Sequence, residues 1–318
     1  MKVLVTGATG FIGRQVVNQL GEAGFEVRMA SRHPKQLDAA SDAVLLPEFD
    51  APAVAFQALM RDITHVVHCA ALNNDRKASE ADFLAANATL TAQLARAAAW
   101  RASGRFIYLS SIRAVAGPGF SGTISEATPL APQCAYGRSK REGEIRMLEA
   151  YASRPADATA LRLPPIYGEG MKGNLANLMR WGGMPVSLAL PAAVFSGVRS
   201  LMSCESAART AVYLLSRPEP LRPVYVVCDL PPLPASAIIR AFRDGYGYSL
   251  KLSKVPAGLM RTVLTLIGKA KAWEAITATQ ICDPSLLVSE GWAPRTDTLE
   301  QLTELARRYK SGAAQLSI

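Results

Sequence analysis

Cysteine and histidine are scarce in this 318-residue chain, and their spacing argues against disulfide frameworks and metal sites. The five cysteines are odd in number, widely spaced and never form a Cys-x-x-Cys pair, which favours a reduced, cytoplasmic setting. Of the three histidines, His65 and His68 stand three apart in a predicted strand, so their side chains point to opposite faces. We therefore expect no metal site.

Long hydrophobic runs and blocks of one charge are also missing. The most apolar stretch, residues 185–198, is short and broken by prolines, so we expect no membrane span. The strand-like Val3-Leu4-Val5 argues against a secretory signal. The net charge of +9 is scattered, without a lysine–arginine block or an aromatic-interleaved basic stripe, so we expect no nucleic-acid partner. An anionic small substrate fits this charge equally well.

Short apolar runs alternate with helical patterns through the first half of the chain. Hydrophobic residues make up 49% and charged residues 19%, as in a folded protein. The runs are continuously apolar, which is typical of strands covered on both faces, so we predict an α/β fold with a Rossmann-type, doubly wound parallel sheet. Strands are predicted at 2–6, 25–30, 43–46, 65–69, 105–110 and 158–163, and helices at 11–23, 51–60, 79–102 and 136–151.

Three glycines, Gly7, Gly10 and Gly13, follow the first predicted strand and open the first helix. A backbone without Cβ lets a pyrophosphate approach the positive end of the helix, and the last glycine lets that helix pack on the sheet. In this context the sequence predicts a dinucleotide site.

The segment after the second strand, Ser31-Arg32-His33-Pro34-Lys35, has no acidic residue. NAD sites usually carry a carboxylate here for the ribose 2′-hydroxyl, whereas an arginine accommodates the 2′-phosphate of NADP. We therefore favour NADP(H) as the cofactor, with NAD(H) possible. The alternative is that this segment is a solvated basic turn without a role in binding. Glu48 and Phe49, after the third strand, are candidates for contact with the adenine.

Tyr136 and Lys140 are one helical turn apart and lie on one face of a predicted helix. A phenol titrates near about pH 10, and a neighbouring ammonium would lower that pKa, so the tyrosine could exchange a proton near neutrality. Ser110 and Ser111 end a predicted strand, where open α/β sheets bind ligands. Either serine could hold the reacting oxygen, although capping of the following turn is the alternative.

With these segments the chain resembles, over nearly its whole length, the extended short-chain dehydrogenases/reductases of the NAD-dependent epimerase/dehydratase family, including the UDP-glucose/UDP-galactose 4-epimerases. The segments that carry the resemblance are 6–13, 68–71, Asn87, 110–111, 136–140, 161–168 and 291–294. The resemblance implies a catalytic triad of Ser111, Tyr136 and Lys140, with Ser111 preferred because it stands 25 residues before the tyrosine.

The predicted cofactor site combines the residues argued above with those that the resemblance implies. It comprises Gly7, Thr9, Gly10, Phe11, Ile12, Gly13, Ser31, Arg32, Glu48, Phe49, Cys69, Ala70, Ala71, Asn87, Tyr136, Lys140, Leu163 and Pro165.

The second half of the chain is richer in proline and glycine, and its predicted strands are shorter. We expect residues 1–165 to form the dinucleotide-binding domain and residues 166–318 a smaller substrate-binding lobe, with about 222–230 returning to the main sheet. Residues 256–271 predict an amphipathic helix. A membrane-surface helix is one interpretation, and we favour a helix whose face of Leu259, Met260, Val263, Leu264 and Ile267 covers the core of the lobe.

The resemblance also suggests the substrate. Lys172, Asn174 and Leu175 resemble a segment that contacts the nucleotide diphosphate in nucleotide-sugar epimerases, and Arg199 resembles their pyrophosphate-binding arginine. Departures are the missing acidic residue after the second strand, the stretch Ile112–Ala116, and the lack of a clear second pyrophosphate arginine between Leu266 and Cys282. The alternative to substrate binding is that Arg199 is a surface arginine and Asn174 a turn asparagine.

We predict NAD(P)-dependent oxidoreduction at C4 of a nucleotide-diphosphate sugar and favour a 4-ketoreductase. A UDP-hexose 4-epimerase with retained NAD is the first alternative, and a non-catalytic NADP-binding sensor or scaffold is the second. The resemblance further implies a homodimer through the helices at 79–102 and 136–151, and a place in envelope polysaccharide synthesis.

Overall fold

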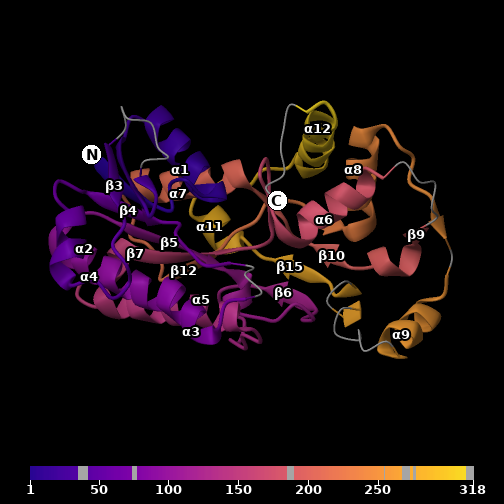
Figure 1. The fold of residues 1–318 in the computed structure, drawn as a ribbon, viewed down its shortest axis with the longest axis horizontal. Helices are drawn as coiled ribbons and strands as arrows, with labels where there is room; N and C mark the ends of the chain where they lie inside the picture. Colours follow the sequence, from indigo (N-terminus) through magenta and orange to yellow (C-terminus); the bar gives the residue numbers. More distant parts are fainter. Residues whose placement is uncertain are drawn as a thin grey trace.

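The chain folds into two parts of unequal size, a large sheet flanked by helices and a smaller part built from the C-terminal half (Figure 1). The computed structural model describes residues 1–34, 42–73, 77–184, 190–253, 255–266, 273–274 and 277–312.

The large sheet has seven strands in the order β12-β7-β5-β4-β1-β2-β3. Every neighbouring pair in it is parallel. This confirms the predicted Rossmann-type sheet, whose strand order reverses between β1 and β4. The strands are β1 (Lys2–Thr6), β2 (Glu26–Ser31), β3 (Asp42–Leu45), β4 (His65–His68), β5 (Phe106–Ser111), β7 (Ala158–Leu163) and β12 (Val224–Val226).

Helices cover both faces of this sheet, which explains why its strands are continuously apolar. One layer contains α1 (Phe11–Glu22), α7 (Cys204–Ser216) and α11 (Ser285–Ser289). The other contains α2 (Ala53–Leu59), α3 (Glu80–Leu84), α4 (Leu90–Arg101) and α5 (Ala135–Ala150) (Figure 1).

The helix predicted at 79–102 is one helical stretch with an unpredicted π-helical turn, Ala85–Thr89, between α3 and α4. Ser79 and Asp82 form a capping box at its start. The π turn frees the carbonyl oxygen of Asn87, which accepts hydrogen bonds from the hydroxyls of Thr91 (2.7 Å) and Tyr108 (3.0 Å).

The smaller part contains a four-stranded sheet in the order β13-β10-β15-β6 and two strand pairs, β8–β11 and β9–β14. Its helices include α6 (Gly173–Gly182), α8 (Ala235–Tyr246), α9 (Ala257–Leu266) and α12 (Thr298–Lys310). Its strands are β6 (Gly122–Ile124), β8 (Ile166–Tyr167), β9 (Leu190–Pro191), β10 (Val198–Arg199), β11 (Met202–Ser203), β13 (Leu233–Pro234), β14 (Leu252–Ser253) and β15 (Gln280–Cys282).

The chain crosses between the two parts several times. Strand β6 precedes residue 165 yet pairs with β15 in the small sheet, while β12 pairs with β7 at the edge of the large one. Helix α7 packs against α1, so residues 204–216 also belong to the large part.

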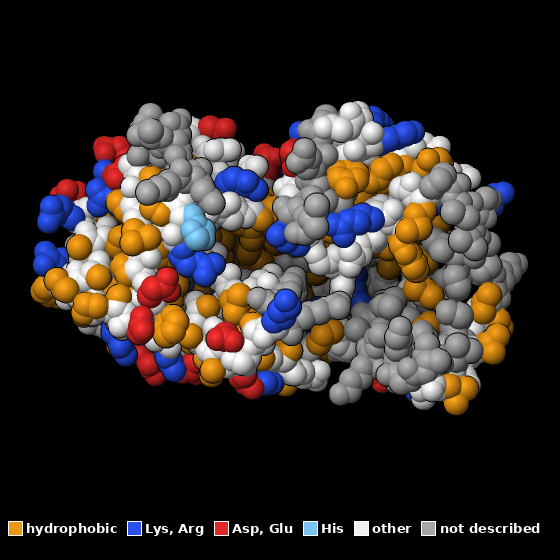
Figure 2. All heavy atoms as spheres, in the orientation of Figure 1, with side chains coloured by type: hydrophobic (Ala, Val, Ile, Leu, Met, Phe, Trp, Pro, Cys, Tyr) orange, Lys and Arg blue, Asp and Glu red, His pale blue; other side chains and the backbone are white. Residues whose placement is uncertain are grey.

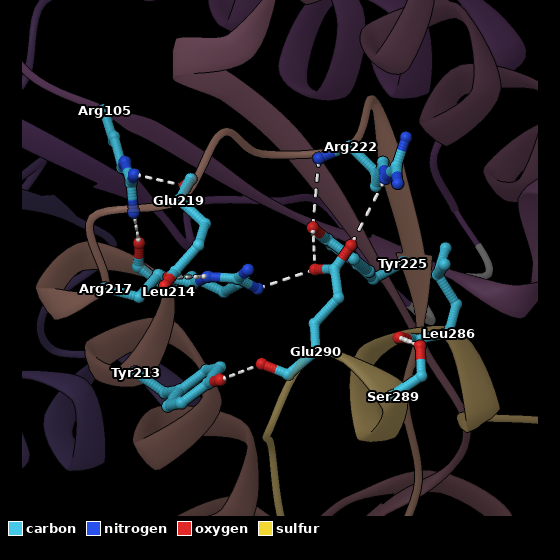
Figure 3. Close-up of polar contacts among 10 residues, drawn as sticks. All are labelled: Arg105, Tyr213, Leu214, Arg217, Glu219, Arg222, Tyr225, Leu286, Ser289 and Glu290. Carbon is cyan, nitrogen blue, oxygen red and sulfur yellow. Dashed lines mark hydrogen bonds and ion pairs between the residues drawn. The ribbon is translucent and has the colours of Figure 1, made fainter.

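A polar cluster around Glu290 fastens α11 to α7 and β12 near the amino ends of the strands (Figure 3). The Glu290 carboxylate accepts hydrogen bonds from Arg217 (2.6 Å), Arg222 (3.2 Å) and Tyr225 (2.7 Å). Burial alone would raise the pKa of Glu290, but these donors outweigh it and lower that pKa. The cluster lies at the amino ends of the strands, whereas Ser111 lies at the carboxyl end of β5. We therefore assign the cluster a structural role.

The expectation that the helix at 256–271 faces the lobe core is wrong for Leu259. Helix α9 forms, but Leu259 is 58% and Leu266 81% exposed. Periodicity shows that one face is apolar without showing what covers it. The side chains of Met260, Val263 and Leu264, and all of Ile267, lie outside the described residues.

None of the helices in the described ranges combines the length and apolar character needed to cross a bilayer. All five cysteines are free thiols.

Candidate active site

The turn between β1 and α1 has the close contacts that require glycine. Gly7 has φ +66°, and a Cβ on it would lie 2.7 Å from the backbone nitrogen of Ala70. A Cβ on Gly13 would lie 2.0 Å from the carbonyl oxygen of Gly7. Helix α1 starts after Gly10 with no side-chain cap and no acidic residue in its first turn. Its first N–H groups are therefore available to a phosphate.

A cleft of about 390 Å³ opens beside this turn at the carboxyl ends of the strands. It brings together ten of the predicted cofactor residues: Gly7, Thr9, Gly10, Ser31, Arg32, Glu48, Phe49, Cys69, Ala70 and Ala71. The lining also includes residues that the sequence analysis missed, namely His33, Leu46, Pro47, Leu72, Asp82, Ala85, Ala86 and Leu90. His33, Leu46, Pro47 and Leu72 are chain neighbours of predicted residues, whereas the α3 and π-turn residues carry no local signal.

The end of β2 presents hydroxyl and guanidinium groups to the cleft. The Ser31 hydroxyl accepts a hydrogen bond from the backbone nitrogen of His33 (3.1 Å) and lies 3.4 Å from the Thr9 hydroxyl. Arg32 is exposed at the cleft. Glu48 lines the cleft from the segment after β3. Lys35 lies outside the described residues.

The structure brings Ser111, Tyr136 and Lys140 together at the carboxyl end of β5. Ser111 ends that strand, and its side chain lies close enough to the Tyr136 hydroxyl to lower the pKa of that phenol. Ser111 also caps the next turn, accepting from the backbone nitrogen of Arg113 (3.2 Å), so the capping alternative holds as well. Lys140 follows one turn later on α5 and is buried, with its Nζ 4.2 Å from the centroid of the Tyr108 ring.

The expectation that Lys140 makes the Tyr136 phenol more acidic is wrong for the protein alone. Burial raises the pKa of Tyr136 to about 12, and the opposing influences are the nearby Ser111 side chain and the charge of Arg113. Burial also lowers the pKa of Lys140 itself to about 7, against the charge of Glu144. A buried ammonium loses its hydration, so the helix geometry alone does not guarantee a charged lysine.

Glu144, which the sequence analysis missed, anchors α5 beneath the site. This buried carboxylate accepts hydrogen bonds from Ser110 of β5 (2.6 Å) and from Arg162 of β7 (2.9 and 3.1 Å). Arg141 adds a contact of 2.9 Å. The available signal was an arginine inside the apolar strand Ala158–Leu163, which needs a buried partner.

Asn87, a predicted cofactor residue, lies fully buried behind the cleft. Its side-chain amide bonds the backbone of Leu72 through both nitrogen (3.0 Å) and oxygen (2.8 Å), and donates to the Ser139 hydroxyl (3.0 Å). All its amide donors and its oxygen are engaged. Asn87 therefore positions the loop after β4 against α5.

His68 extends this buried polar chain beneath the site. The Thr91 hydroxyl donates its hydrogen to Asn87, so it must accept from His68 Nε2 (2.9 Å). His68 Nδ1 then accepts from the Thr6 hydroxyl (2.6 Å). Burial, with the charge of Lys140 second, lowers the pKa of His68 to about 3. The histidine is a neutral packing element next to Lys140.

Four other predicted cofactor residues do not line the cleft. Phe11 opens α1 and packs, with Leu175 of α6, against the core of the smaller part. Ile12 packs in the core of the large part, Leu163 is buried at the end of β7, and Pro165 is exposed after it.

The predicted substrate residues lie on the smaller part. Lys172 and Asn174 are exposed at the start of α6, with Lys172 at the N-cap position. Arg199 is half-buried on β10, and burial followed by the charge of Arg113 lowers its pKa. Within the described residues, no group of three or more His, Cys, Asp or Glu side chains is placed to hold a metal ion.

A sequence model of the NAD dependent epimerase/dehydratase family matches residues 3–228. UDP-glucose 4-epimerase of Vibrio cholerae is 27% identical over 316 residues, covering 96% of this chain and 95% of that protein. D-erythronate dehydrogenase of Cupriavidus necator is 32% identical over 68% of each chain. MoeE5, solved in complex with UDP-glucuronic acid and NAD, superposes with a TM-score of 0.76 at 22% identity, covering 98% of this chain and all of that one.

Proposed function

The chain belongs to the NAD-dependent epimerase/dehydratase family, and on this premise we propose that it transfers hydride at C4 of a nucleotide-diphosphate sugar, as a 4-ketoreductase. The observation that carries the proposal is the contact between Ser111 and Tyr136 at the carboxyl edge of the sheet, with Lys140 on the next turn of α5. This group adjoins the same sheet edge as the glycine turn and its cleft.

We assign the proton chemistry to this chain's own residues. The bound nicotinamide supplies the hydride. The Tyr136 hydroxyl donates the proton to the substrate oxygen and becomes a phenolate. The Ser111 hydroxyl, which lies beside the Tyr136 hydroxyl, orients that oxygen. Protonated Lys140 would hold the nicotinamide ribose, and its charge stabilises the Tyr136 phenolate that forms.

We assign the rest of the substrate to the lobe predicted within residues 166–318 and the dinucleotide to residues 1–165. Lys172, Asn174 and Leu175 at the start of α6 would hold the nucleotide diphosphate, with Arg199 on its other side. Support comes from the packing of Leu175 and Phe11 against one cluster, which sets the starts of α6 and α1 near each other.

We further propose that the cofactor is NADPH. The end of β2 carries Ser31 and Arg32 and no carboxylate, so it suits a 2′-phosphate. Replacing Arg32 with Ala should raise the Kd for NADP⁺ by about 10- to 100-fold, because a charge-assisted bond is lost. The Kd for NAD⁺ should stay within about threefold. Titration of both dinucleotides checks this. Tighter binding of NAD⁺ than NADP⁺ by the wild type would remove the preference.

Incubation with UDP- and dTDP-4-keto sugars plus NADPH tests the reaction. A 4-ketoreductase consumes one NADPH for each sugar reduced, and the product stereochemistry identifies the reduced carbon. If the chain instead converts a UDP-hexose into its C4 epimer without net consumption of cofactor, the 4-epimerase alternative is correct. The end-to-end similarity to a UDP-glucose 4-epimerase favours that alternative. Binding of NADP⁺ with neither reaction would indicate a sensor or scaffold. The presence of Ser111, Tyr136 and Lys140 argues against that alternative.

We also propose a homodimer through the outward faces of α4 and α5. Trp100 of α4 supports this, since 65% of its surface is exposed. Sedimentation equilibrium of the full chain measures the state directly.

A further inference from the structure

Arg113 lies between the reacting residues and the smaller part. Its backbone nitrogen bonds the Ser111 hydroxyl (3.2 Å). A Cβ on Gly137, in the first turn of α5, would lie 2.2 Å from the carbonyl oxygen of Arg113. The Arg113 backbone therefore packs tightly against the helix that carries Tyr136. Its charge acts on the Tyr136 phenol.

The Arg113 side chain reaches across to β15. Its Nη2 donates to Gln280 Oε1 (3.0 Å) and its Nη1 to the Ala116 carbonyl (3.3 Å). The Gln280 amide nitrogen donates to the carbonyls of Gly117 (2.8 Å) and Pro118 (3.1 Å). These bonds fix the orientation of the amide, so its oxygen must face Arg113.

The same strand places a second guanidinium nearby. Arg199 of β10 is the strand neighbour of Gln280, and the charge of Arg113 acts on it. Both acceptors of Arg113 are neutral, and no carboxylate forms an ion pair with it in the part of the chain that the structure describes. The half-buried positive charge of Arg113 and that of Arg199 repel each other, and an anion beside Arg113 offsets that repulsion.

We propose, on the basis of the function proposed above, that Arg113 is a further substrate-binding residue that takes an anionic oxygen of the nucleotide sugar next to the Ser111–Tyr136 pair. Its remaining N–H donors suit a phosphate or carboxylate. That oxygen belongs either to the diphosphate or to a carboxylate on the sugar. Figure 2 shows a hollow between the two parts with Lys and Arg side chains at its rim, so the field there attracts such a ligand.

Calorimetric titration of the full chain, saturated with dinucleotide, tests this with Arg113→Gln and Arg113→Lys. The ligands are UDP, UDP-glucose and UDP-glucuronate, and the matching thymidine compounds. We expect Arg113→Gln to raise the Kd by about 10- to 100-fold and Arg113→Lys less, because lysine keeps the charge and loses the fork. Arg222→Gln, at the opposite edge of the sheet, is the matched control. An unchanged Kd for the dinucleotide shows that the variants fold.

The pattern of loss identifies the oxygen. A loss shared by all ligands, the free diphosphates included, assigns Arg113 to the diphosphate. A loss confined to the glucuronates assigns it to the sugar carboxylate. Equal Kd values for wild type and Arg113→Gln with every ligand that the wild type binds would overturn the inference and leave the proposed function intact. If the wild type binds none of the ligands, the proposed substrate class fails and the role of Arg113 with it.

Discussion

At the scale of single residues, the protonation of Lys140 is controlled by its buried surroundings. Its ammonium lies over the Tyr108 ring, and the neutral His68 ring stacks on the same tyrosine, with centroids 5.4 Å apart. Burial lowers the pKa of Lys140 to about 7. The protein alone therefore has a partly neutral lysine at neutral pH.

Dinucleotide binding should return the proton to Lys140. The ribose hydroxyls and the pyrophosphate charge favour the ammonium, so binding raises its pKa. At about pH 8 most of the free protein lacks this proton and the complex holds it, which predicts uptake of up to about one proton; at about pH 6 both states hold it and uptake vanishes. Calorimetry in buffers of different ionisation enthalpy measures the uptake. Lys140→Met should abolish it, and equal uptake by that variant would contradict the assignment.

At the scale of elements, α5 is held in place by a buried ion pair. Arg162 and Glu144 are 3% and 1% exposed, and the carboxylate bonds both β5 and β7. This is how a helix that packs on the sheet keeps Tyr136 and Lys140 over the end of β5. Removal of one partner would leave the other charge buried without compensation.

Glu144→Gln should therefore lower the free energy of unfolding by about 3–5 kcal/mol. Urea denaturation measures the change. Glu142→Gln, which removes a half-exposed pair with Arg146 on the same helix, is the matched control and should change it by less than about 1 kcal/mol. Equal stability of the two variants would show that the buried pair does not anchor the helix.

The elements divide into those that local sequence determines and those that it does not. The apolar run Ala158–Leu163 and the glycines after β1 could be predicted because burial and close approach act on neighbouring residues. The π turn at Asn87 and the partner of Arg162 could not, because they depend on contacts between distant segments. The apolar face of α9 was visible in the sequence, but its exposed Leu259 depends on what packs there.

At the scale of the whole molecule, function depends on how the two parts meet. Strand β6 leaves the first half of the chain to pair with β15, and this pairing brings Gln280 to Arg113 beside Ser111. Composition predicted a second part after residue 165, but no local pattern predicted that pairing. The cleft beside the turn between β1 and α1 opens at the carboxyl ends of the same strands.

The central claim is that Tyr136 moves the proton that accompanies hydride transfer. The most direct test is Tyr136→Phe, in which single-turnover hydride transfer and the dinucleotide Kd are measured in the same preparation with the sugar that the wild type converts. We expect transfer to slow by about 10²–10⁴-fold while the Kd stays within about threefold. Transfer at the wild-type rate would contradict it.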